Sequence, residues 1–311
     1  MAVTVGIAGI TGKFARCILA NLLKQPSVTV RGYCRDPTKL PPSIQSSPRI
    51  HLTKGESGDV QALQSFVRGT DVVICCYLGD NQLMTDGQKK LIDACELEGV
   101  KRYIASDYTL DFTKLEYGQL PSKDPMKAVK DYLSTKSVEG VHVLIGAFMD
   151  TFWSQWFGIW DPVKVPFSYW GTGEEAWEST SYENAAEFVS AVALDDCAIG
   201  MQKFLGDRKN IFQLAELFER VYGVKPKLER LGSLDELYKR MHQLKTQDPQ
   251  NIFSYLNLFY QYYCTNGQTY LNIDPEKEEH PDVKRVTFED YLRSHSMESL
   301  ATAVQSVGST L

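Results

Sequence analysis

Apolar runs and amphipathic stretches alternate through the first half of the chain. Short apolar runs lie near residues 3–8, 28–34, 49–53, 71–79, 100–106 and 141–148. Helical patterns of apolar and polar positions separate several of these runs, at 13–23, 84–99 and about 125–137. Continuous apolar strands that alternate with helices are typical of a parallel sheet covered by helices on both faces. The pattern therefore predicts an α/β fold built on a parallel sheet.

The pattern changes at about residue 150. Five tryptophans fall between residues 153 and 177, and residues 251–263 are aromatic on almost every helical face, which predicts a largely buried helix. Several helix starts are marked by capping residues, namely Asn210 with Gln213, Ser233 with Glu236, and Thr287. We therefore expect a Rossmann-type domain over residues 1–150 and a smaller, mainly helical part over residues 151–311.

A glycine-rich turn joins the first predicted strand to the first predicted helix. Gly9 permits a tight turn, Gly12 lets the backbone approach a pyrophosphate, and the small Ala15 allows close packing of helix on strand. The start of the helix offers free N–H groups and a partial positive charge to phosphates. A strand before the turn and a second strand about twenty residues later are the context that a dinucleotide site requires. The predicted cradle consists of Gly9, Thr11, Gly12, Lys13, Phe14 and Ala15.

The end of the second predicted strand indicates which dinucleotide is bound. An acidic residue there binds the ribose of NAD, whereas Arg or Lys binds the 2′-phosphate of NADP. Arg35 is placed for a bidentate phosphate contact, with Lys39 in support. Asp36 is an alternative ribose ligand, although an Asp before Pro37 is also a good helix cap. The sequence favours NADP(H) as the cofactor.

Composition excludes several other functions. The net charge is −6 and no basic stripe is present, which argues against a nucleic-acid partner. No apolar run approaches the 18 residues of a membrane span, and the start of the chain has no signal-peptide pattern. The seven cysteines include no C-x-x-C pair, so we expect a reducing, cytoplasmic environment. The five histidines are scattered, and we predict no metal site.

Motifs along nearly the whole chain resemble the NmrA-like and isoflavone-reductase-like group of atypical short-chain dehydrogenases/reductases, and in particular its fungal members. The motifs are GITGKFA (9–15), RDPTK (35–39), ASDY (105–108), IGAFMD (145–150), GTGEEAWESTSYENAA (171–186) and FLGDRKNIFQLAELFERVYG (204–223). This resemblance implies a Rossmann domain followed by a smaller substrate-binding part. It also implies cofactor contacts at the glycine loop, Arg35, Cys76, Tyr77, Ser106, Gly146, Ala147 and Phe148. Strand-end packing is the alternative for Cys76 and Tyr77, and a local turn or cap is the alternative for Ser106.

The catalytic residues are harder to place. Relatives in this group carry a lysine three positions before a helix valine, and the matching frame at Val129 puts Met126 there. Lys127 is its neighbour and becomes our candidate, although a helix turns about 100° per residue and an exposed lysine is the alternative. Lys123 and Lys130 lie within about a turn. Tyr132 and Lys136 have the Tyr-x-x-x-Lys spacing, but they fall about two turns too late, and we interpret that spacing as coincidence.

Short-chain reductases usually carry a tyrosine as proton donor, and the resemblance places none at that position here. Asp107 and Tyr108, beside the expected nicotinamide, are the candidates for this role, and turn and packing roles are the alternative. The aromatic residues after residue 147 are candidate walls of a substrate pocket, with core packing as the alternative. These candidates are Phe148, Phe152, Trp153 and Trp156.

Two functions are consistent with these features. The first is an NADPH-dependent reductase of a hydrophobic aromatic or heterocyclic metabolite, acting on a carbonyl, imine or conjugated double bond. The resemblance to fungal pathway enzymes adds the expectation that reduction accompanies cyclisation in secondary metabolism. The second is a non-catalytic regulator that senses NADP(H), because the same group contains such proteins.

Overall fold

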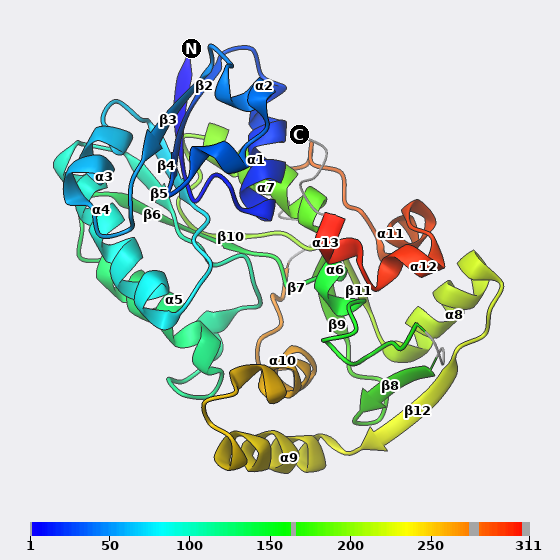
Figure 1. The fold of residues 1–311 in the computed structure, drawn as a ribbon. Coiled ribbons are helices and arrows are strands. Elements are labelled where there is room, and N and C mark those ends of the chain that lie inside the picture. Colours follow the sequence, from blue (N-terminus) through cyan, green and yellow to red (C-terminus); the bar gives the residue numbers. More distant parts are fainter. Residues whose placement is uncertain (1, 163–165, 274–279, 307–311) are drawn as a thin grey trace.

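The computed structural model of the protein describes residues 2–162, 166–273 and 280–306 (Figure 1). Its centre is a seven-stranded, all-parallel sheet with the strand order β10-β6-β5-β4-β1-β2-β3. The strands are β1 (Val3–Ala8), β2 (Val28–Cys34), β3 (Ile50–Lys54), β4 (Val72–Cys75), β5 (Arg102–Ile104), β6 (Glu139–Leu144) and β10 (Gly200–Lys203). The parallel sheet expected from the apolar runs is confirmed.

Helices cover both faces of this sheet, as Figure 1 shows. On one face, α1 (Lys13–Leu23) packs against α7 (Tyr182–Leu194), and the short α2 (Pro42–Gln45) lies near the sheet edge at β3. The other face is covered by α3 (Val60–Val67), α4 (Gln88–Leu97) and α5 (Asp124–Leu133). Two apolar cores result, one on each side of the sheet, which explains why the strands read as continuous apolar runs. The α/β Rossmann-type fold is confirmed.

The chain beyond residue 150 contributes to the Rossmann sheet. It supplies the edge strand β10 and the covering helix α7, so the two parts that the sequence suggested share one sheet. The rest of this region forms two short sheets, one of β7 (Ala147–Phe148), β9 (Trp177–Thr180) and β11 (Asp207–Lys209), the other of β8 (Pro166–Trp170) and β12 (Lys227–Gly232). The remaining helices are α6 (Met149–Phe152), α8 (Ile211–Tyr222), α9 (Leu234–Gln247), α10 (Leu256–Thr265), α11 (Phe288–Ser294), α12 (Met297–Leu300) and α13 (Ala303–Ser306).

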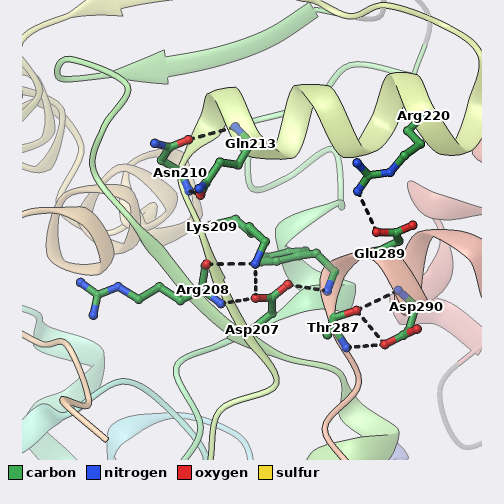
Figure 2. Close-up of polar contacts among 10 residues, drawn as sticks. Asp207, Arg208, Lys209, Asn210, Gln213, Arg220, Thr287, Glu289 and Asp290 are labelled. Carbon is green, nitrogen blue, oxygen red and sulfur yellow. Dashed lines mark hydrogen bonds and ion pairs between the residues drawn. The ribbon is translucent and has the colours of Figure 1, made fainter. Parts of the chain in front are cut away.

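The predicted helix caps are present, and side-chain contacts join them to neighbouring elements (Figure 2). At the start of α8, Asn210 Oδ1 accepts a hydrogen bond from the Gln213 N–H at 2.9 Å, and Gln213 Oε1 accepts one from the Asn210 N–H. Thr287 and Asp290 form the same reciprocal pair at the start of α11. Asp207 joins β11 to α11 by accepting hydrogen bonds from Lys209 Nζ and the Phe288 N–H. These contacts lie around α8 and α11, at the right of the view in Figure 1.

Two of the predicted elements are interrupted in the structure. The apolar run at 141–148 is split, because Gly146 has a φ of +72° and turns the chain out of the main sheet, after which β7 pairs with β9. The aromatic run at 251–263 starts with a 3-10 turn at Ile252–Ser254, and α10 begins only at Leu256. Among the described residues, no helix has the length and apolar character needed to cross a membrane.

Candidate cofactor and substrate site

The glycine turn lies where β1 ends, close to the ends of β2 and β4. Gly9 has a φ of +80°, and a Cβ there would lie 2.9 Å from the carbonyl oxygen of Cys76. A Cβ at Gly12 would lie 3.2 Å from the carbonyl oxygen of Gly9. Gly12 also caps α1 with its backbone alone, since no side chain accepts from the first turn of that helix. The uncapped helix start leaves N–H groups for a bound anion, so the local geometry fits a pyrophosphate.

A cavity of about 770 Å³ opens beside this turn. Six of the residues predicted to contact the cofactor line it, namely Gly9, Thr11, Gly12, Arg35, Cys76 and Tyr77. The cavity is also lined by Ser57 and Gly58 after β3 and by Lys90 on α4. Those three were not predicted, although the small residues of GESG at 55–58 directly after a strand are a signal of close backbone approach. The cavity follows the strand ends, as a dinucleotide site in a Rossmann fold does.

Arg35 and Asp36 have separate roles at the end of β2. Arg35 lines the cavity. The Asp36 carboxylate accepts hydrogen bonds from the Thr38 N–H at 3.1 Å and the Thr38 hydroxyl at 2.6 Å, and these bonds lower the pKa of Asp36. Asp36 therefore serves as the cap of the short 3-10 helix at Pro37–Lys39. Lys39 is not among the residues that line the cavity.

A second cavity, of about 730 Å³, adjoins the first. Both are lined by Gly12, Cys76, Tyr77 and Leu78, so the cofactor cradle leads directly into the second cavity. The walls of the second cavity are mostly apolar and aromatic. They include seven more of the predicted contact residues, namely Lys13, Phe14, Ala15, Ser106, Gly146, Ala147 and Phe148. The predicted cofactor residues thus lie together along two connected cavities, with Lys39 and Lys127 outside them.

The loop after β5 is held by side-chain contacts. The Ser106 hydroxyl donates to the Tyr77 carbonyl at 2.8 Å. The Tyr108 hydroxyl donates to the Cys75 carbonyl at 2.9 Å, and burial raises the pKa of Tyr108 well above its usual value. Tyr108 also has a φ of +41°, an uncommon conformation for a bulky residue. The side chain of Asp107 is fully buried against His142. Both predicted acids line the second cavity. The Tyr108 hydroxyl and one Asp107 oxygen have these partners, whereas Oδ1 of Asp107 is buried without a hydrogen-bond partner among the described residues.

The lysines near the start of α5 face different surroundings. Met126 and Lys123 line the second cavity, whereas Lys127 does not. The Lys127 ammonium donates to the Leu115 carbonyl at 2.6 Å and lies over the ring of Tyr117. Lys123 lies on the 3-10 turn Pro121–Lys123, four residues before Lys127. Residues four apart lie on the same face of an α-helix, so helical periodicity does not indicate which of the two lysines lines the cavity.

The Tyr-x-x-x-Lys pair lies at the end of α5, with Tyr132 in its last turn and Lys136 beyond it, and neither residue lines either cavity. The Tyr132 hydroxyl donates to Asp93, and Lys136 forms ion pairs with Asp93 and Glu96 at 2.7 and 3.0 Å. The interpretation of this spacing as coincidence agrees with that placement.

The aromatic candidates divide between cavity and core. Phe148 and Trp156 line the second cavity. Phe152 and Trp153 are 0% exposed, pack on each other with ring centroids 5.0 Å apart, and belong to the core. Tyr182, which was not predicted, stacks on Phe148 with ring centroids 3.8 Å apart and also lines the cavity. It is the first residue of α7, and no sequence signal separates it from a helix start packed in the core.

Comparison with known proteins agrees with this geometry. Residues 9–142 match the NAD(P)H-binding family model. A fungal relative, the oxidoreductase dmxR7 of Cryptosporiopsis sp. (strain 8999), is 38% identical over 73 residues, which is 22% of this chain and only 31% of the relative. The bifunctional pinoresinol-lariciresinol reductase 1 of Linum usitatissimum is 24% identical over 259 residues, 78% of this chain and 81% of the relative.

Solved structures with the same fold include an isoflavone reductase, with a TM-score of 0.77 and 20% identity over 94% of this chain and 99% of that one. A second is AtPrR2 with NADP+ and (+)pinoresinol, with a TM-score of 0.78 and 17% identity over the same shares of the two chains. The protein therefore carries an NAD(P)H-binding domain of the Rossmann class. Within that class it has the isoflavone-reductase-like fold that the sequence motifs predicted.

Proposed function

We propose that the protein is an NADPH-dependent reductase of a hydrophobic aromatic or heterocyclic metabolite. The observation that carries the proposal is the pair of adjoining cavities, one against the glycine turn and one with mostly apolar walls. A cofactor in the first cavity would have its reactive end at the entrance to the second, because Gly12, Cys76 and Tyr77 line both. The aromatic side chains Phe14, Phe148 and Tyr182 would exclude water from that entrance.

The proposed reaction is the two-electron reduction of a carbonyl, imine or conjugated carbon–carbon double bond. Bound NADPH supplies a hydride to one atom of that bond, a proton adds to the other, and NADP+ is the oxidised product. The chain positions the substrate and keeps the site dry, which are the main contributions that a protein makes to hydride transfer. The proposal includes a fungal secondary-metabolite pathway in which this reduction is coupled to cyclisation.

Preference for NADP(H) over NAD(H) rests on the end of β2. Arg35 lines the first cavity and would bind a 2′-phosphate, while the Asp36 carboxylate is taken up by Thr38. The neighbours AtPrR2 with NADP+ and leucoanthocyanidin reductase with NADPH have the same fold and support this choice. Lys39 remains a proposed supporting residue that would have to turn toward the phosphate.

The proton donor remains a proposal among the residues that the sequence suggested. Asp107 and Tyr108 line the second cavity. The Tyr108 hydroxyl would have to leave the Cys75 carbonyl, whereas Asp107 would have to expose its unpartnered Oδ1 to the substrate and could keep Oδ2 on His142. Lys127 would have to leave the Leu115 carbonyl and move toward the cavity. Lys123 also lines the cavity, but we assign it no part in the proton transfer.

One contact favours a second candidate function, an NADP(H)-sensing regulator. Lys13, in the glycine turn, donates to the Val304 carbonyl on α13 at 2.7 Å. A phosphate bound to the turn would attract the same ammonium and so change the contact with α13. Under this alternative, cofactor binding alters the surface around α13 and no substrate is reduced.

The test begins with thermal unfolding in the presence of NADPH, NADP+, NADH or no ligand. A ligand at about 100 times its Kd stabilises the fold by about 2.7 kcal/mol, so binding is visible as a rise in Tm. We expect a rise with the phosphorylated cofactors, followed by NADPH oxidation when planar quinones or enones are added. No rise with any cofactor would reject both functions. A rise without oxidation of NADPH across such a panel would favour the regulator.

A further inference from the structure

A buried lysine faces the apolar cavity without an acidic partner. Lys123 is 5% exposed and lines the second cavity. Among the described residues, no carboxylate forms an ion pair with Lys123. Its ammonium makes a cation–π contact with Tyr260, whose ring centroid lies 5.1 Å from Nζ. The adjacent Asp124 is directed elsewhere, since both of its carboxylate oxygens accept from the Gly118 N–H. A buried charge without a partner is costly, so a functional reason for this one is expected.

Two other partly buried lysines, Lys203 and Lys114, have their charge compensated by a carboxylate. Lys203 donates to Asp111 at 3.1 Å and to the Leu271 carbonyl at 2.9 Å. Lys114 also lies within 3.6 Å of Asp111. Lys123 differs because only an aromatic face compensates it, which leaves the ammonium able to bind an anion.

Tyr260 adds a second donor beside the ammonium. Its hydroxyl accepts a hydrogen bond from the Ser122 hydroxyl at 3.1 Å, so its own proton is available to a ligand. Ser122 precedes Lys123 on the 3-10 turn, whereas Tyr260 lies on α10, in the C-terminal half of the chain. The two donors therefore converge on the cavity from two elements that are held together by this bond.

Two other charged residues line the cavity. Lys13 is exposed and donates to the Val304 carbonyl, and the side chain of Asp107 is 0% exposed, so Lys123 is the buried cation of this lining. Trp156 lies beside Tyr260, with ring centroids 6.3 Å apart, and Phe157 and Leu256 continue the apolar wall. An apolar surround strengthens the attraction between an ammonium and an anion.

We propose that Lys123 and Tyr260 form an anion-binding subsite, and that the substrate is a planar aromatic molecule with an ionised oxygen, either a carboxylate or a phenolate-type enolate. The inference rests on the proposed reductase function, whose substrate class it narrows. The ionised oxygen accepts from Nζ of Lys123 and from the Tyr260 hydroxyl, and the aromatic body packs on Trp156 and its neighbours. This subsite selects the substrate and takes no part in transferring hydride or proton.

The first experiment needs no variant. 2-Naphthoate and its uncharged analogue 2-naphthamide are titrated by calorimetry into the NADP+-loaded chain at about pH 7. We expect the acid to bind about 10- to 100-fold more tightly, which is the range of a charge-assisted hydrogen bond. A parallel pair is 2-hydroxy-1,4-naphthoquinone, ionised near neutral pH, and its methyl ether, compared by kcat/KM with NADPH. Preference for either anion supports the subsite and identifies the kind of oxygen; equal values in both pairs overturn it.

Variants then assign the preference to the residue. Lys123→Met is expected to bring the affinity of the acid down to that of the amide, while Lys123→Arg keeps most of the preference. Lys130→Met is the matched control, because Lys130 lies on α5 outside the lining of the cavity. A full preference retained in Lys123→Met, with the NADPH-induced rise in Tm intact, would also overturn the subsite. Failure of the reductase function itself is recognised separately, by absent turnover of the neutral methyl ether.

Discussion

The carboxylate of Asp107 lies 2.6 Å from Nδ1 of His142, and the two side chains are 0% and 6% exposed. Asp107 follows β5 and lines the second cavity, and His142 lies on β6, so the pair joins the loop after β5 to the neighbouring strand. The other oxygen of the Asp107 carboxylate is buried and has no hydrogen-bond partner in the part of the chain that the structure describes. His142 therefore supplies the main compensation for a buried acid beside the site.

Replacing His142 is expected to destabilise the fold. His142→Leu leaves the Asp107 charge buried without its partner, which costs about 3–5 kcal/mol of unfolding free energy. Chemical denaturation measures that loss. The double variant Asp107→Asn, His142→Leu removes the charge as well, so it should be more stable than the single His142 variant. A loss below about 1 kcal/mol in the single variant would contradict this role for the pair.

Arg35→Ser is expected to reduce the preference for NADPH over NADH. Loss of a charge-assisted contact to the 2′-phosphate corresponds to about 1.5–3 kcal/mol, or roughly a 10- to 100-fold change in the ratio of the two Kd values. Calorimetric titration with each cofactor gives that ratio. Lys39→Ser is the comparison, because Lys39 does not line the cavity and should change the ratio less. An unchanged ratio in Arg35→Ser would remove Arg35 from cofactor selection.

Lys127→Ala tests whether Lys127 is catalytic, as predicted from the sequence, or stabilises the fold through its contact with Leu115, as the structure indicates. A catalytic lysine would abolish NADPH oxidation at an unchanged Tm. The bond from Lys127 to the Leu115 carbonyl instead predicts a loss of about 0.5–1.5 kcal/mol in stability with turnover retained, and we expect this second result. Steady-state kinetics and thermal unfolding of the same preparation decide between the two.

Phe152→Ala is expected mainly to lower stability, and Trp156→Ala mainly to raise the KM for the substrate. Phe152 is fully buried in the core, and its removal should cost about 3–5 kcal/mol of stability. Trp156 is 36% exposed and lines the second cavity, so its removal should cost much less stability but raise the KM for an aromatic substrate. Denaturation and kinetics on both variants test the contrast, which fails if Trp156→Ala leaves KM unchanged for every substrate that is turned over.

Gly146→Ala is expected to distort the lining of the second cavity. Gly146 has a φ of +72°, and a Cβ there would lie 2.4 Å from the Glu178 carbonyl oxygen, so the chain on either side must shift. Gly118 is the matched control, since its φ is +84° but a Cβ would meet nothing within 4 Å. We expect Gly118→Ala to cost about 1–3 kcal/mol, the strain of the conformation alone. Gly146→Ala should cost clearly more and weaken NADPH binding, as measured by unfolding with and without cofactor.

Local sequence was sufficient for the features that depend on a few neighbouring residues. The glycine turn at Gly9 and Gly12 needs only backbone freedom and a following helix, and Arg35 needs only to follow the second strand. The capping pairs at Asn210, Ser233 and Thr287 are formed within three residues, and the structure contains all three. The continuous apolar strands also reflect burial on both faces, which is a property of each strand's own composition.

Tertiary structure decided what depends on helix phase and on distant segments. Whether Lys123 or Lys127 faces the cavity depends on where the 3-10 turn passes into α5, a difference of one turn that a periodic pattern does not fix. The same apolar spacing puts Phe152 in the core and Trp156 at the cavity, because Phe288 on α11 and Trp177 on β9 pack on Phe152. Tyr260 reaches the site from more than a hundred residues away. Such contacts arise from the whole chain packing together, so composition and spacing near any one residue do not contain them.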